Sequence, residues 1–136
     1  MFVVDDEARI LDAIGRMLEG DGWAVSLFES PSEALEACDE EPPGFVITDF
    51  VMAEMSGEEL AVKLRVDLGS RCPKIVCVTA WLHELRPEQI RVFDCVLQKP
   101  FAYCDLVREL DDLEDEGETR VSGMRLRFPW IEEGTG

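Results

Sequence analysis

The chain has 136 residues, a length that fits one domain with a substantial hydrophobic core. Hydrophobic residues make up 46% of it, which excludes an intrinsically disordered chain. The formal net charge is −17, so phosphate backbones would repel the protein and we expect no direct nucleic-acid partner. No apolar run is long enough to cross a membrane and the N-terminus does not resemble a signal peptide, so we expect a cytoplasmic protein.

Strand-like and helix-like segments alternate along the chain. Short apolar runs predict strands at 2–4, 23–28, 45–49, 74–79 and 95–98. Helical spacing predicts helices at 7–19, from 31 to about 38, from 57 onward, from 87 to about 92 and at about 102–115. Ser30 and Ser56 are each followed three residues later by Glu, which is an N-cap signature. This alternation predicts an α/β fold, a doubly wound parallel sheet of five strands with helices on both faces.

Charged residues follow three of the predicted strands. Asp5 and Asp6 follow the first strand, Asp49 ends the third and Lys99 follows the fifth. Ligands of open α/β sheets bind beyond the carboxyl ends of the strands, so these side chains should meet there. Carboxylates crowded together repel one another unless a cation joins them, and oxygen ligands favour Mg²⁺. The predicted chemistry is a carboxylate that takes up a phosphoryl group beside a metal, with Lys99 as the balancing charge.

Four motifs, each at a strand end, resemble those of response-regulator receiver domains of the chemotaxis-regulator (CheY-like) type. They are Val3 to Glu7, Thr48 to Met52 with Met55-Ser56-Gly57, Val78-Thr79-Ala80, and Lys99-Pro100-Phe101. The resemblance covers about residues 2–114. It implies a flavodoxin-like sheet order of 2-1-3-4-5 and a protein of two-component phosphorelay signalling.

The resemblance also implies a magnesium site. Asp5 and Asp6 would hold Mg²⁺, and Asp49 together with the backbone carbonyl of Val51 would complete the protein ligands. Asp49 would be the phosphoacceptor and would take its phosphoryl group from the phosphohistidine of a histidine kinase or phosphotransfer protein. The phosphorylated form would then signal to a downstream protein by a conformational change.

Two further residues acquire roles from the resemblance. Lys99 would contact the phosphoryl group, and Thr79 would hydrogen-bond one of its oxygens and move with the loop that follows. The peptide bond between Lys99 and Pro100 would be cis, which proline makes accessible. We therefore expect a signalling phosphoacceptor and no enzyme in the usual sense, one that at most catalyses its own phosphotransfer and dephosphorylation.

The chain departs from the family pattern at several positions. Ala53 stands where proline is common, so the loop after Asp49 should be more mobile. Val96 stands where an aromatic residue usually rotates as a switch. The stretch from Thr79 to Lys99 is short for the family, so we expect a short or irregular fourth helix.

We divide the chain into a receiver domain, residues 1–115, and a C-terminal tail, residues 116–136. Apolar residues alternate with Arg125, Arg127 and Pro129 in the tail; they are Met124, Leu126, Phe128 and Trp130. This alternation predicts an extended segment with its apolar face buried against the domain or against a second copy, as in a homodimer. A tail without a structural role is the alternative. The residues after the last helix are too few for a DNA-binding domain.

Two other functions are open from the sequence. A magnesium-dependent phosphatase with an aspartate nucleophile would need an acidic residue two positions after Asp49, where Val51 stands. A receiver-like interaction module that never takes phosphate would have no need of Thr79, Lys99 and three aspartates.

The five cysteines contain no C-x-x-C pair, which favours reduced structural thiols; redox sensing by an exposed Cys38 or Cys104 is the alternative.

Overall fold

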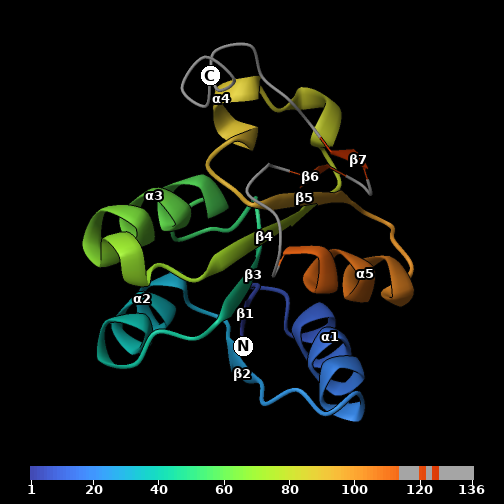
Figure 1. The fold of residues 1–136 in the computed structure, drawn as a ribbon, viewed down its shortest axis with the longest axis horizontal. Coiled ribbons are helices and arrows are strands. Elements are labelled where there is room, and N and C mark those ends of the chain that lie inside the picture. Colours follow the sequence, from blue (N-terminus) through green and yellow to red (C-terminus); the bar gives the residue numbers. More distant parts are fainter. Residues whose placement is uncertain (114–119, 122–123, 126–136) are drawn as a thin grey trace.

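The protein folds around one twisted sheet, shown in Figure 1 for a computed structural model that describes residues 1–113, 120–121 and 124–125. Within this sheet the five predicted strands lie side by side in the order β2-β1-β3-β4-β5, and all of them are parallel. Their bounds are β1 Phe2–Val4, β2 Ser26–Phe28, β3 Phe45–Asp49, β4 Lys74–Thr79 and β5 Cys95–Gln98. The predicted fold class and strand order are confirmed.

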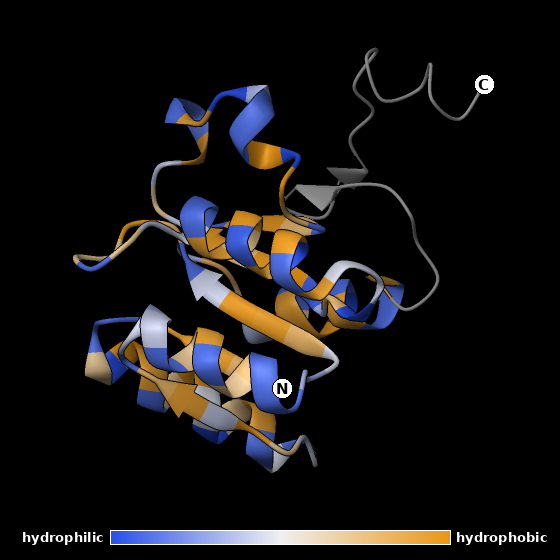
Figure 2. Cartoon of the chain, turned by 90° about the vertical axis from the view of Figure 1, so that its left-hand side faces the viewer, coloured by the Kyte–Doolittle hydropathy of each residue, from blue (hydrophilic) through white to orange (hydrophobic). Residues whose placement is uncertain are grey.

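The helices cover both faces of the sheet. They are α1 Ala8–Gly20, α2 Pro31–Glu40, α3 Gly57–Leu68, α4 Pro87–Ile90 and α5 Tyr103–Leu113, with short 3₁₀ turns at η1 Gly69–Arg71 and η2 Leu82–Glu84. Leucines of α1 and α5 pack on one face of the sheet, and apolar residues of α2, α3 and α4 pack on the other. Figure 2 shows the same layering as hydrophobic central strands between helices with hydrophilic outer sides. The two layers leave the carboxyl ends of β1, β3, β4 and β5 together at one edge.

Local signals in the sequence set the starts of α2 and α3. The Ser30 hydroxyl accepts a hydrogen bond from the Glu33 amide, and Ser56 accepts one from the Glu59 amide. Gly57 at the start of α3 lies so close to the end of β3 that a Cβ would be 2.4 Å from the Asp49 carbonyl oxygen. Glycine is therefore required at this position, and α3 begins directly against Asp49.

The second strand is shorter than expected, and the fourth helix is as short as expected. The second strand spans only Ser26–Phe28, because the Trp23 amide donates to the Leu18 carbonyl and closes the turn after α1. The fourth helix spans only Pro87–Ile90, in agreement with the expectation of a short element, and η2 precedes it. Cys38 is buried, so the alternative of redox sensing by an exposed Cys38 does not apply, whereas Cys104 is exposed.

Two further strands extend the sheet beyond β5. Arg120–Val121 forms β6, parallel to β5, and Met124–Arg125 forms β7, antiparallel to β6. Residues 124 and 125 of the segment predicted to be extended form β7, whereas residues 126–130 and the predicted burial of the four apolar side chains lie outside the described residues. Within the described part of the chain, no helix combines the length and the apolar composition that a membrane crossing requires.

Candidate functional site

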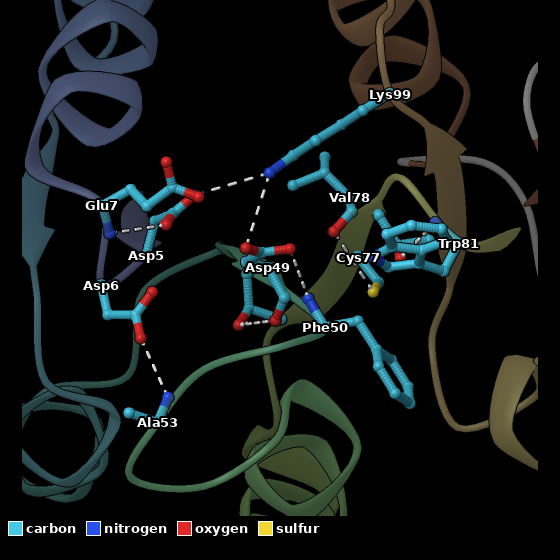
Figure 3. A network of polar contacts seen from close by, with 12 residues as sticks. Asp5, Asp6, Glu7, Asp49, Phe50, Ala53, Cys77, Val78, Trp81 and Lys99 are labelled. Atoms are coloured by element: carbon cyan, nitrogen blue, oxygen red, sulfur yellow. Dashed lines mark hydrogen bonds and ion pairs between the residues drawn. The ribbon is translucent and has the colours of Figure 1, made fainter.

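Three carboxylates converge at the carboxyl edge of the sheet (Figure 3). Asp5 and Asp6 follow β1, and Asp49 is the last residue of β3, whose neighbour in the sheet is β1. One oxygen from each carboxylate lies within 4.8 Å of an oxygen of both others. The predicted convergence is confirmed, and it follows from the parallel register that pairs Val4 with Thr48.

Lys99 brings a positive charge to these carboxylates. Its ammonium lies 3.5 Å from Asp49 Oδ2 and 3.8 Å from Asp5 Oδ2. The Lys99 amide donates to the Thr79 carbonyl at 2.8 Å, and the Lys99–Pro100 peptide bond is cis as expected. The side chain thereby crosses from β5 over the end of β4 to the acidic cluster, as Figure 3 shows.

Backbone amides orient the three carboxylates. Asp5 Oδ1 accepts from the Glu7 amide at 2.9 Å, and Asp49 Oδ1 accepts from the Phe50 amide at 2.8 Å. Asp6 Oδ2 accepts from the Ala53 amide at 2.9 Å, a bond that joins the end of β1 to the loop after β3. A proline at position 53 could not make this bond because it has no amide hydrogen. The Asp6 bond therefore anchors the loop that the sequence predicted to be more mobile.

Burial makes the charges of Asp5 and Asp49 costly. Asp5 is 1% exposed, and desolvation raises its pKa from 3.8 to about 6. Desolvation also raises the pKa of Asp49, although the Lys99 ammonium and the Phe50 amide act in the opposite direction. Within the described residues, Asp5 Oδ2 is buried without a hydrogen-bond partner. The positively charged Lys99 ammonium lies 3.8 Å from Asp5 Oδ2, which is too far for a hydrogen bond.

These residues fit a small divalent cation. The site has more carboxylate charge than Lys99 can balance, and Asp5 Oδ2 is a buried oxygen that lacks a donor. Mg²⁺ prefers oxygen ligands, commonly one or two carboxylates with waters completing an octahedron. The chemistry of the donors therefore favours Mg²⁺ over the softer metals that select sulfur or imidazole. The carbonyl of Val51 as a further ligand stays a prediction.

Thr79 ends β4 beside this cluster. It is buried, and its Oγ1 accepts a hydrogen bond from the Trp81 amide at 3.0 Å. A hydroxyl that accepts a bond still has its own hydrogen to donate. Thr79 is thus held by the loop that follows it and keeps a donor for an anionic ligand.

Sequence reasoning missed Gln98 in this region, and for Ala53 it missed the hydrogen bond to Asp6. Gln98 hydrogen-bonds the loop after Thr79, and Ala53 hydrogen-bonds Asp6. Gln98 could have been noticed as an amide in a strand that is otherwise apolar. Ala53 gave no comparable signal, since its contribution is a backbone amide that any residue except proline supplies.

Comparison with known proteins agrees with this geometry. Over residues 1–111 the chain matches the family described as the response regulator receiver domain. The chain belongs to this family. Its acidic pocket of Asp5, Asp6 and Asp49 fits the phosphoacceptor site of a receiver domain.

Named relatives support the assignment to the receiver family. The chain is 32% identical over 118 residues to the response regulator receiver protein CpdR of Brucella abortus, an alignment that covers 83% of this chain and 94% of CpdR. It is 28% identical over 134 residues to the response regulator MprA of Mycobacterium tuberculosis, with 94% of this chain and 56% of MprA covered. The chain thus spans about half the length of MprA.

Solved structures have the same fold. The response regulator TrrA of Thermotoga maritima, in complex with Mg²⁺-BeF, has a TM-score of 0.75 and 28% identity, with 82% of this chain and 96% of TrrA covered. A CheY-like receiver domain of Methylobacillus flagellatus has a TM-score of 0.75 and 25% identity, with 82% and 95% covered. The receiver domain described here is therefore part of a signalling family.

Proposed function

We propose that Asp49 is the phosphoacceptor of this receiver domain and that its donor is a phosphohistidine of a histidine kinase or phosphotransfer protein. One observation carries the proposal. The Asp49 carboxylate lies at the meeting point of the Lys99 ammonium and the two carboxylates of Asp5 and Asp6. A nucleophile in this place has a positive charge on one side and oxygen ligands for a cation on the other.

The transfer requires little covalent chemistry from the protein. A carboxylate oxygen of Asp49 attacks phosphorus, the P–N bond of the phosphohistidine breaks, and its electron pair stays with the imidazole. A P–O bond forms and leaves an acyl phosphate on Asp49. Positioning and charge stabilisation account for most of the catalysis of phosphoryl transfer. This domain would therefore catalyse at most its own phosphotransfer and dephosphorylation.

Each remaining residue of the site has a part in this proposal. Asp5 and Asp6 would hold Mg²⁺ together with Asp49 and the Val51 carbonyl, and the ion would neutralise charge on the transferring group when bound. The Lys99 ammonium would pair with a phosphoryl oxygen. Thr79 would donate its hydroxyl hydrogen to another. The complex of TrrA with Mg²⁺-BeF supports this assignment, because a relative with the same fold binds that pair of ligands.

Phosphoryl uptake is the direct test. Wild-type protein incubated with Mg²⁺ and acetyl phosphate should form an acid-labile, hydroxylamine-sensitive adduct, visible as a mass increase. Asp49→Asn should abolish the adduct because the amide lacks the nucleophilic oxygen charge. Lys99→Ala should still take up phosphate, but the conformational response to phosphorylation should be weaker. Asp12→Asn is the control, since Asp12 is an exposed residue of α1 paired with Arg16.

The outcomes separate the competing functions. An adduct at wild-type level on Asp49→Asn would place the acceptor elsewhere. No adduct on the wild-type protein, with Mg²⁺ present, would favour an interaction module that does not take phosphate. Turnover of a phosphomonoester by the wild type would favour a phosphatase, although the structure has Val51 and no acid two residues after Asp49.

A further inference from the structure

The Gln98 side chain spans the gap between the ends of β4 and β5. Gln98 is the last residue of β5 and lies opposite Thr79, the last residue of β4. Its Oε1 accepts from the Leu82 amide at 3.1 Å, and its Nε2 donates to the Ala80 carbonyl at 2.9 Å. Nε2 also donates to the Lys99 carbonyl at 2.8 Å. The Gln98 side chain thus accepts one hydrogen bond from the loop after β4 and donates another to it. It also donates to Lys99, the residue that follows β5.

The hydrogen bonds of the Gln98 side chain extend the hydrogen-bond ladder between β4 and β5 beyond the ends of the two strands. The last backbone link between the two strands runs from the Lys99 amide to the Thr79 carbonyl at 2.8 Å. Both strands have ended at this point, and the carboxamide of Gln98 serves as the hydrogen-bond partner for the backbone of residues 80 and 82. An amide is suited to this because it offers both a carbonyl acceptor and hydrogen donors. An apolar side chain of the same length could not do so.

The loop in turn holds the Thr79 hydroxyl. The Trp81 amide, which donates to Thr79 Oγ1, lies between the two residues that Gln98 fixes. Because the hydroxyl accepts from Trp81, its hydrogen remains available for a phosphoryl oxygen. The arrangement held by Gln98 is therefore already the one in which Thr79 can act as a donor. A group fixed in advance has less conformational entropy to lose when it binds.

We infer that Gln98 is a positioning residue of this receiver site, which preorganises the Thr79 hydroxyl through the 80–82 loop and fixes the backbone of Lys99. The inference rests on the proposed function of Asp49. Its hydrogen bonds to the Leu82 amide and the Lys99 carbonyl are partly buried, which protects them from competition by water. Gln98 acts through Thr79 and Lys99, and does not itself contact Asp49 among the contacts described.

The test uses beryllofluoride with Mg²⁺ as the probe and Gln98→Met as the variant. Methionine keeps the length of the side chain and removes its hydrogen bonds. Loss of one or two net hydrogen bonds should weaken the binding of the probe by about 3- to 10-fold. In the protein without the probe, hydrogen exchange of the Leu82 amide should be faster by a similar factor.

Gln89→Met is the matched control. Gln89 also holds backbone with its side chain, accepting from the Arg86 amide and donating to Glu58, but it does so at the start of α4. It should bind the probe as the wild type does. Circular dichroism and melting temperature check that both variants fold alike.

The results distinguish this inference from the proposal on which it rests. The assignment of Asp49 is contradicted if the wild-type protein binds no beryllofluoride. It is also contradicted if the Asp49→Asn variant binds beryllofluoride as tightly as the wild type does. Wild-type protein that binds through Asp49, with Gln98→Met binding equally tightly or more tightly, overturns the role of Gln98. Unchanged exchange of the Leu82 amide in Gln98→Met overturns it as well, whatever the probe does.

Discussion

The buried carboxyl of Asp5 makes the metal-free protein less stable as the pH rises. Its pKa is raised from 3.8 to about 6 by desolvation, so the folded state binds this proton more tightly than the unfolded state does. The stability of the folded state therefore decreases as the pH rises through this interval, and stays lower above it. Mg²⁺ would offset this cost, because it supplies positive charge to ionised carboxylates.

Asp5→Asn should consequently stabilise the metal-free protein at neutral pH. The shift corresponds to about 3 kcal/mol at most, and solvent on the open side of the site reduces the expected gain to about 1 to 2 kcal/mol. At about pH 4 the gain should be small, since the native carboxyl is then protonated. Urea unfolding with a chelator at both pH values measures the difference. An equal gain at both would show that the ionisation of Asp5 is not its cause.

The residues of the site divide into those that a sequence reveals and those that it does not. Asp5, Asp6, Asp49 and Lys99 could be predicted because each follows a short apolar run, and parallel strands bring such ends together. The role of Gln98 could not, since its partners are backbone groups of a loop whose path depends on the whole sheet. Almost any residue type can supply the backbone group of such a hydrogen bond, so the sequence does not show which residue is the partner.

At the scale of elements, the connection from α4 to β5 depends on side chains and not on regular structure. Arg65 of α3 donates from Nε to the Val92 carbonyl at 2.7 Å and from Nη2 to Asp94 Oδ2 at 3.2 Å. The same Asp94 oxygen accepts from the Ile75 amide of β4 at 2.7 Å. Asp94 thus ties α3, β4 and the start of β5 together where α4 is short.

Asp94→Ala should therefore destabilise the protein by about 1 to 3 kcal/mol, because it removes the acceptor of the Ile75 amide and of Arg65 Nη2. The free energy of unfolding from chemical denaturation measures this loss. Asp12→Ala removes an exposed i,i+4 pair with Arg16 on α1 and should cost only about 0.2 to 0.5 kcal/mol. Equal losses in the two variants would mean that the Asp94 network does not hold the connection.

Predicted and observed elements differ where apolar residues serve purposes other than a strand. Trp23 and Val25 look like the start of a strand, yet both pack against the core on the α1 side while the chain turns from α1 into β2. Trp23 contacts Phe45 edge-on at 5.8 Å between ring centroids. The apolar pattern correctly indicated burial at these positions, but burial alone does not specify backbone pairing. The alternation of strands and helices predicted that the strands are parallel, whereas their order in the sheet, 2-1-3-4-5, was predicted from the resemblance to a family.

At the scale of the whole molecule, β6 and β7 change the edge of the sheet. In their absence β5 would be an edge strand, with unpaired backbone groups that can pair with another chain. Arg120 and Val121 occupy this edge by pairing with Cys95 and Val96. We propose that the tail, residues 116–136, completes the receiver unit of residues 1–115 through β6 and β7, which cover the edge of β5.

Two truncations test this proposal. A chain that ends after Glu116 lacks β6 and β7, whereas a chain that ends after Arg125 keeps both strands and loses only residues 126–136. The first should melt at a lower temperature and should associate through the exposed β5 edge, since an uncovered strand offers a template for pairing. The second isolates the contribution of Leu126, Phe128 and Trp130, whose burial would contribute roughly 1.5 to 3 kcal/mol each. Melting temperature and sedimentation measure both effects. If the shorter chain matches the full-length protein in both, the tail is passive and β5 needs no cover.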